Sequence, residues 1–195
     1  MIERKATVTR RTTETSVKVE INIDGTSQFE VSTGIRFFDH MLTQIAQHGI
    51  FDLKISASGP DQHHVVEDVA ITLGRAFNKA LGDKQGIIRM GHAIIPMDDA
   101  LAMVALDISG RGYAIVEDSL KDAYISEMQS DLVHHFFVSF SSEARINLHA
   151  QVMSGTNDHH KAEALFKALA RALDMATHID PRIADIIPST KDSIE

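Results

Sequence analysis

Apolar and polar residues alternate along short stretches of the chain, which is the pattern of strands that bury one face of a sheet. In the first half, this alternation predicts strands over residues 6–13, 16–23, 28–32 and 51–59. In the second half, it predicts one strand from residue 93 and others over residues 101–108, 113–116 and 147–153. Polar turns such as "DGTS" separate neighbouring strands, so each half is expected to form a small sheet.

Other segments repeat their apolar residues every three to four positions, as amphipathic helices do. They cover residues 37–49, 64–81, 131–144 and 158–177. In the first of them, Phe38, Met41, Leu42 and Ile45 form one apolar stripe, and Gly49 is expected to end the helix. Each half therefore combines strands with two helices. This predicts the α+β class, with the helices packed between two small mixed sheets in β-α-α-β layers.

The two halves also match each other in sequence. "HHVVEDVAITLGRAF" begins at His63, and "HHKAEALFKALARAL" begins at His159, about half the chain later. "ETSVKVEINIDG" matches "DALAMVALDISG", and "FDHML" matches "VHHFF", with residues 117–127 as an insertion in the second half. We therefore expect an internal duplication within one domain. The expected parts are a first half-repeat over residues 1–90, a second over residues 91–180, and a C-terminal tail over residues 181–195.

The composition narrows the classes of protein. The 195 residues carry a formal charge of −8, are 44% apolar, and include 11 histidines and no cysteine. The negative charge argues against broad nucleic-acid binding, which depends on many Lys and Arg contacts to phosphates. No apolar run approaches the roughly 20 residues of a membrane span, and the N-terminus lacks the apolar core of a signal peptide. We therefore expect a cytoplasmic protein without disulfides or thiolate metal sites.

Two adjacent histidines and a glutamate recur at the same spacing in both halves. The two groups are His63, His64 and Glu67, and His159, His160 and Glu163. In each group the first histidine and the glutamate share a helix face, whereas the second histidine points about 100° away. One ion would not readily take all three side chains, but two ions could, each with ligands from both halves. His40 and His135, at matching positions of the duplication, would complete the sets.

These ligands leave several alternatives open. Imidazole and carboxylate suit Mn, Fe, Zn or Ni, and the affinity order does not choose among them. A single HHxxE group is more often an ordinary polar helix start, so the metal interpretation depends on its repetition in register. In the "HH" at 134–135 either histidine could be the ligand, and His135 is preferred because it aligns with His40. Arg89, Arg111 and the "PSTK" of the tail could bind an anion or could be ordinary surface groups.

Motifs along nearly the whole chain resemble the imidazoleglycerol-phosphate dehydratase family. They are "RRTTET", "GIRFFDHML", "HGIFDL", "HHVVEDVAITLG", "GHAIIPMDDAL", "DISGRGY", "DLVHHFF", "GTNDHHKAEALFKALARAL" and "PSTK". The resemblance implies a lyase of histidine biosynthesis that converts D-erythro-imidazole glycerol phosphate to imidazole acetol phosphate. It also implies helices between two sheets, two Mn²⁺ ions per active site, and a homo-oligomer, a 24-mer, with active sites where subunits meet.

The resemblance also implies roles for individual residues. The implied metal ligands are His40, His63, His64, Glu67, His135, His159, His160 and Glu163. The implied substrate-binding residues are Glu14, Gln44, His48, Arg89, Arg111, Ser189 and Lys191, of which the last four would hold the phosphate. Glu14, Glu67 and Glu163 are the expected catalytic residues. Glu14 and a metal-bound hydroxide remain two candidates for taking the C–H proton.

Two other functions compete with the dehydratase interpretation. A binuclear metallohydrolase would activate water against a phosphate ester, but it usually needs a carboxylate, often Asp, that bridges the metals. A protein that stores or senses metal could use the same histidines, but it would not need Arg89, Arg111 or "PSTK". We therefore expect an enzyme that acts on a small phosphorylated imidazole compound, and neither nucleic acid nor membrane as a partner.

Overall fold

Four strands of the first half form one sheet in a computed structural model that describes residues 4–194. The strands are β1 (Lys5–Arg11), β2 (Ser16–Asn22), β3 (Phe29–Ser32) and β4 (Asp52–Ser58), paired in the order β1-β2-β4-β3. β2 pairs antiparallel with β1 and β4, and β3 pairs parallel with β4. Val17, Val19 and Ile21 of β2 are buried, whereas Lys18 and Glu20 lie on the other face. The alternation in the sequence therefore marks the buried face of this sheet.

The second half repeats this sheet with the same strand order. Its strands are β5 (Met90–Met97), β6 (Ala100–Asp107), β7 (Tyr113–Glu117) and β10 (Asn147–Ser154), paired in the order β5-β6-β10-β7. β6 pairs antiparallel with β5 and β10, and β7 pairs parallel with β10. This is the arrangement that duplicated half-domains produce. The boundary near residue 90 stays a prediction, because strand order does not locate it.

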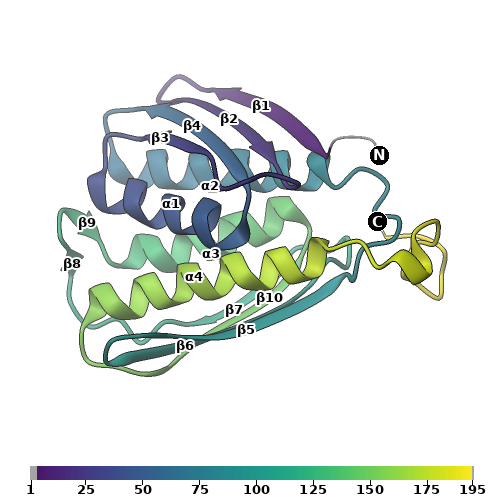
Figure 1. Ribbon diagram of the computed structural model, residues 1–195. Helices are drawn as coiled ribbons and strands as arrows, with labels where there is room; N and C mark the ends of the chain where they lie inside the picture. Colours follow the sequence, from purple (N-terminus) through teal and green to yellow (C-terminus); the bar gives the residue numbers. More distant parts are fainter. Residues whose placement is uncertain (1–3, 195) are drawn as a thin grey trace.

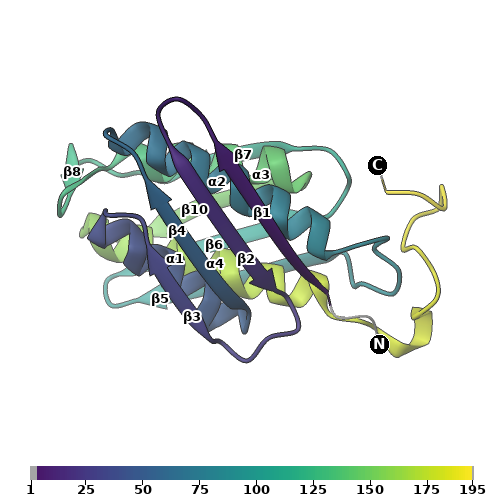
Figure 2. The same ribbon diagram turned by 90° about the horizontal axis from the view of Figure 1, so that it is seen from above.

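The helices lie between the two sheets, as Figure 1 shows. They are α1 (Arg36–Gly49), α2 (Gln62–Ala80), α3 (Asp131–Ala144) and α4 (Asp158–Thr177). α2 packs on β1 and β2, α4 packs on β5 and β6, and between these layers α2 contacts α3 and α1 contacts α4. From above, the first sheet spreads across the helices (Figure 2). The predicted α+β class with β-α-α-β layers is confirmed. Within residues 4–194, no helix is long and apolar enough to cross a membrane.

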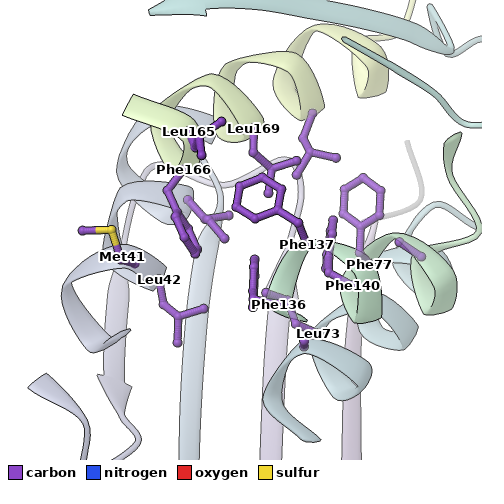
Figure 3. Close-up of a cluster of buried hydrophobic side chains, with 14 of the residues drawn as sticks. Met41, Leu42, Leu73, Phe77, Phe136, Phe137, Phe140, Leu165, Phe166 and Leu169 are labelled. Atoms are coloured by element: carbon purple, nitrogen blue, oxygen red, sulfur yellow. The ribbon is translucent and has the colours of Figure 1, made fainter. Parts of the chain in front are cut away.

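Phenylalanines of α3 occupy the centre of the core between the helices (Figure 3). The Phe136 ring stacks on Phe140 and on Phe166 of α4, with centroids 5.9 and 4.9 Å apart. α2 approaches α3 closely at Gly74, where an added Cβ would lie 2.7 Å from the Phe140 carbonyl oxygen. A larger residue at position 74 would therefore separate the two helices that carry His63 and His135.

The insertion in the second half, residues 117–127, leads into a hairpin that the hydrophobic pattern did not predict. Its strands, β8 (Tyr124–Ile125) and β9 (Met128–Gln129), are two residues long, too short to show an alternating pattern. The buried Asp158 at the start of α4 accepts hydrogen bonds from the backbone N–H groups of Lys121 (2.6 Å) and Asp122 (2.7 Å). Lys161 completes this anchor, because its Nζ donates to Asp158 (2.7 Å) and to the Ser119 carbonyl oxygen (3.1 Å). The insertion is therefore fixed beside the first turn of α4.

Candidate metal centre and active site

The two HHxxE groups lie in the first turns of α2 and α4, and both turns are capped in the same way. The Asn157 side chain accepts hydrogen bonds from the backbone N–H groups of His159 (2.9 Å) and His160 (3.2 Å). Asp61 accepts one from the backbone N–H of His64 (3.2 Å). Each cap satisfies backbone donors that have no partner inside the helix. The caps therefore fix the direction in which each pair of histidines leaves its helix.

One candidate metal cluster joins α1 to α4 and consists of His40, His159 and Glu163. One ligand atom from each of these three residues lies within 4.8 Å of the others. The Glu163 Oε2 atom is 3.1 Å from His40 Nε2 and 3.3 Å from His159 Nε2. We call this group the α1–α4 cluster. It combines a histidine of the first half with a histidine and a glutamate of the second.

Lys167, one turn further along α4, holds the other oxygen of Glu163. Its Nζ lies 2.6 Å from Glu163 Oε1, and both side chains are largely buried. Burial alone would raise the pKa of Glu163, but hydrogen bonds from Lys167 and His40 outweigh it, so the pKa is lowered. Glu163 is therefore kept as a carboxylate with Oε2 directed at the two histidines. The sequence analysis did not select Lys167, although its i, i+4 spacing from Glu163 places it on the same helix face.

The second candidate cluster joins α2 to α3 and consists of His63, Glu67 and His135. Its ligand atoms also lie within 4.8 Å of one another, and His135 Nε2 is 3.5 Å from Glu67 Oε1. The His63 and His135 rings stack with centroids 4.6 Å apart. His135 Nε2 is buried and makes no hydrogen bond within the described part of the chain, residues 4–194. In this α2–α3 cluster, too, each half of the chain supplies ligands.

Of the adjacent histidines at 134 and 135, the structure brings only His135 to a cluster. His134 is exposed, and its Nδ1 lies 3.4 Å from Asp118 in the insertion. His135 lies one residue further around α3 and faces Glu67 on α2. The structure thus places His135 in a candidate cluster, and its role as a ligand stays a prediction.

His64 and His160 join neither cluster within one chain. His64 Nδ1 lies 3.5 Å from Glu14 and 3.7 Å from Asp61. His160 Nδ1 lies 2.7 Å from Asp99 Oδ1. The pKa of Asp99 is lowered by hydrogen bonds from the Thr156 backbone N–H, His160, the Thr156 hydroxyl and the Asn157 backbone N–H. A carboxylate at Nδ1 fixes the ring orientation, as it does in metal-binding histidines, and His160 Nε2 lies 3.5 Å from Asp98.

Glu127 in the β8–β9 hairpin connects the starts of two helices. Its side chain accepts a hydrogen bond from the Phe37 backbone N–H (2.9 Å) in the first turn of α1, and its carbonyl oxygen accepts one from the Gln62 side chain (2.9 Å) in α2. The hydrogen bond from the Phe37 backbone N–H is the main reason that the pKa of Glu127 is lowered. Because Phe37 precedes His40 and Gln62 precedes His63, both clusters lie at the same end of the helix layers.

Polar side chains continue from the α1–α4 cluster along α1. His40, Gln44 and His48 follow one another at single-turn spacing on α1, and Gln44 Nε2 lies 3.3 Å from His40 Nδ1. On α4, Arg171 donates to the His48 carbonyl oxygen (3.3 Å). The pKa of His48 is lowered by burial and by the nearby positive charges of Lys167 and Arg171. Gln44 and His48 are therefore brought into line with His40, and Arg171 adds a cation that the sequence analysis did not select.

The residues expected to hold the phosphate lie at the other end of the molecule. Arg89 donates to both Asp107 oxygens (2.7 and 3.0 Å), to the Pro188 carbonyl oxygen (2.8 Å), and through its backbone to Ala176 in the last turn of α4. Ser189 and Lys191 follow Pro188 in the tail, at the right of Figure 1. Most of α4, which is about 30 Å long with its 20 residues, separates them from the α1–α4 cluster.

Arg111 is also distant from the clusters within one chain. It precedes β7, and the adjacent Gly112 packs against Ser142 in the last turn of α3. The Arg111 carbonyl oxygen accepts a hydrogen bond from Asn147 (2.8 Å), while its side chain is exposed. The cluster residue of α3, His135, lies in the first turns of that helix. The structure of one chain thus separates the expected ligands from the expected phosphate contacts.

Known proteins resemble this chain over its whole length. The family model described as imidazoleglycerol-phosphate dehydratase matches residues 33–173. An imidazoleglycerol-phosphate dehydratase of Dehalococcoides mccartyi (strain CBDB1) is 57% identical, with all of both chains covered. The enzyme of Roseiflexus sp. (strain RS-1) is 52% identical, with 96% of each chain covered.

Solved structures agree with these relatives. The imidazoleglycerol-phosphate dehydratase of Staphylococcus aureus superposes with a TM-score of 0.83 at 35% identity, covering 90% of this chain and 99% of that one. The Pyrococcus furiosus enzyme, solved in complex with (S)-C348, has a TM-score of 0.83 at 37% identity, covering 95% and 99%. The chain therefore belongs to the imidazoleglycerol-phosphate dehydratase family, whose members are lyases of histidine biosynthesis.

Proposed function

We propose that this enzyme dehydrates D-erythro-imidazole glycerol phosphate to imidazole acetol phosphate with two metal ions, one held by each cluster. The observation that carries the proposal is the pair of equivalent clusters, each of two histidines and one glutamate at one end of the helices. The buried Nε2 of His135 supports it, because residues 4–194 give this nitrogen no hydrogen bond, which is costly unless a ligand satisfies it. The imidazole and carboxylate side chains of the clusters fit a divalent ion such as Mn²⁺, our proposed metal.

Two ions at these clusters would act as Lewis acids toward the two ring nitrogens of the substrate. The hydroxyl on the carbon attached to the ring then leaves with a proton as water, and a base removes the proton from the next carbon. The resulting enol becomes the ketone, so no oxidant or reductant is needed. Glu14 is our proposed base, because its carboxylate projects beside His64 at the cluster end and is more than half exposed.

We further propose that subunits share each active site. His64 and His160 lie outside the clusters of their own chain, and the phosphate-binding candidates lie at the far end of the helices. A neighbouring subunit could supply each cluster with one of these histidines and with the phosphate-binding residues. The pocket beside His159, about 240 Å³ and lined partly by Tyr124 and Ser126, is smaller than the 300–1,000 Å³ typical of ligand sites. A neighbour could close it, and the 24-mer is our proposed assembly.

The outer face of the second sheet is a further argument for association with other copies of the chain. Exposed apolar residues lie on this face, whereas the outer face of the first sheet is polar at the equivalent positions. The exposed apolar residues are Met90, Ile94, Tyr113, Ile115 and Met153. Such a patch is typical of an interaction surface. A cytoplasmic location remains our proposal and agrees with the absence of cysteine.

Turnover by metal-stripped protein tests this function. We expect no ketone to form from imidazole glycerol phosphate without metal, and activity to return when Mn²⁺ is added. A protein that binds two ions per chain and leaves the substrate unchanged would contradict the proposal. Hydrolysis of the phosphate ester instead of dehydration would favour a metallohydrolase, although both clusters contain Glu and no Asp.

A further inference from the structure

Asp68 is a buried carboxylate that neither cluster uses. It follows Glu67 on α2 and therefore points about 100° away from it, toward the first sheet. Its side chain is only 7% exposed. One oxygen accepts a hydrogen bond from Arg10 Nε of β1 (2.6 Å), and the other accepts one from the buried hydroxyl of Thr15. A buried carboxylate needs such partners, so these contacts tie α2 to the start of β2.

The Thr15 hydroxyl belongs to a chain of hydrogen bonds that shapes the turn between β1 and β2. Thr15 Oγ1 lies 3.1 Å from Thr12 Oγ1. Thr12 Oγ1 in turn accepts hydrogen bonds from the backbone N–H groups of Glu14 (3.1 Å) and Thr15 (2.9 Å). If each hydroxyl donates toward Asp68, every donor and acceptor in this chain has a partner. The backbone of Glu14 is thus connected through two threonines to α2.

The turn also packs tightly against the segment that leads into α2. A Cβ added at Gly59 would lie 3.0 Å from the Thr15 methyl group and 3.2 Å from the Glu14 carbonyl oxygen. At the tip of this turn the Glu14 carboxylate lies 3.5 Å from His64 Nδ1, although it is 56% exposed. An exposed side chain has little packing of its own to hold it. Its position therefore depends on the backbone beneath it.

We propose that Asp68 is a positioning residue for Glu14, acting through Thr15 and Thr12. It holds the turn on the same helix that carries His63, His64 and Glu67, so that the base and the ligands keep a fixed relative position. The inference rests on the proposed role of Glu14 in proton transfer. A displacement of about 1 Å at a catalytic group can cost on the order of 100-fold in rate, so the turn need not unfold for the effect to be large.

Variants of Thr15 test this inference in the assembled, Mn²⁺-loaded enzyme. Thr15→Val keeps the shape of the side chain but removes the hydroxyl that binds Asp68. We expect kcat to fall about tenfold to 100-fold, with KM and bound Mn²⁺ nearly unchanged. Thr15→Ser, which keeps the hydroxyl, should restore most of the activity. Thr13→Val makes the same chemical change at an exposed position of the turn and should resemble wild type. Asp68→Asn changes the other partner of this hydrogen bond, on α2, and is a second test of the same inference.

A double-mutant cycle shows whether the effect passes through Glu14. In a Glu14→Gln background, Thr15→Val should lower kcat no further, because the group it positions is already inactive. An equal decrease in both backgrounds, or no decrease in wild type, would overturn the inference. Hydrogen exchange gives a readout that does not depend on activity. The amides of Glu14 and Thr15 should exchange faster in Thr15→Val and Asp68→Asn, while those of β4 remain protected.

The two measurements separate failure of this inference from failure of the proposed function. Faster exchange together with full turnover by Glu14→Gln would show that Asp68 holds the turn but that Glu14 is not the base. Unchanged exchange in both variants would show that Asp68 does not hold the turn, whatever the role of Glu14.

Discussion

The two cluster glutamates occupy equivalent positions in the duplicated halves but have different surroundings. Glu163 is only 7% exposed and lies between His40, His159 and Lys167, whereas the Glu67 side chain is 37% exposed. A charge that is removed from a buried pair leaves its partner without compensation. Mutation at the two sites should therefore affect metal binding similarly and stability differently.

Glu163→Gln and Glu67→Gln test this difference. We expect each variant to bind one Mn²⁺ per chain in place of two. Only Glu163→Gln should also lose stability, by about 1 to 3 kcal/mol, because Lys167 loses its partner. Metal analysis and urea unfolding of the metal-free proteins measure the two effects. Glu143→Gln, which disrupts a surface pair with Arg75, is the control. Equal destabilisation by both cluster variants would contradict this account.

The surroundings of Asp158 predict how the stability of the protein depends on pH. Burial raises the pKa of Asp158, but the Asp122 backbone N–H, Lys161 and the Lys121 backbone N–H together lower it below the ordinary value. Because the pKa is lower in the folded state, Asp158 contributes to the free energy of unfolding above about pH 4. This contribution is lost as the pH falls further.

Asp158→Asn should therefore be less stable than wild type near pH 7, by about 3 to 5 kcal/mol, since Lys161 is left buried without a counter-charge. The difference should shrink as the pH falls below about 4. Urea midpoints of both proteins from pH 3 to pH 8 measure it. A constant difference across this range would mean that the charge of Asp158 contributes nothing.

At the scale of elements, the β8–β9 hairpin and the segment before it connect the helices that carry the two clusters. Asp158 and Lys161 anchor this segment to α4, and Glu127 at the tip of the hairpin contacts the starts of α1 and α2. α1 has no side-chain cap from its own N-cap residue, Ile35. Glu127 thus supplies from a distant segment what a local cap normally supplies.

Glu127→Ala should lower the stability of α1 by about 0.5 to 2 kcal/mol, the usual cost of losing a cap. It should also weaken Mn²⁺ binding at the α1–α4 cluster, because His40 lies in the next turn. Urea unfolding and calorimetric titration with Mn²⁺ measure the two effects. Glu30→Ala, which removes an exposed ion pair with Lys54, should leave both unchanged. Normal binding by Glu127→Ala would show that the hairpin does not support the site.

Sequence periodicity predicted most elements because each buries one face, and the observed bounds differ from it by a few residues. The pairings of His63 with Glu67 and His159 with Glu163 were also predictable, because i, i+4 spacing is a local property. The role of Glu127 was not, since its contact with Phe37 spans 90 residues. Asp68 was missed for a similar reason: its partners, Arg10 and Thr15, belong to another element.

At the scale of the whole molecule, the clusters and the phosphate-binding candidates lie at opposite ends of the helix layers. The separation follows from the fold, because the clusters occupy the first turns of the helices, and the tail with Ser189 and Lys191 follows the last turn of α4. A complete site of the proposed kind therefore requires association. Native mass spectrometry should give twenty-four times the mass of the chain, and a stable, active monomer would contradict shared active sites.

The most direct test of the two-cluster account is a crystal structure of the Mn²⁺-loaded enzyme, with anomalous scattering measured at the manganese edge. We predict two manganese peaks per chain, one among His40, His159 and Glu163 and the other among His63, Glu67 and His135. At each peak we expect a further ligand, His64 or His160, from a neighbouring subunit. A single peak per chain, or two peaks away from these clusters, would contradict the account.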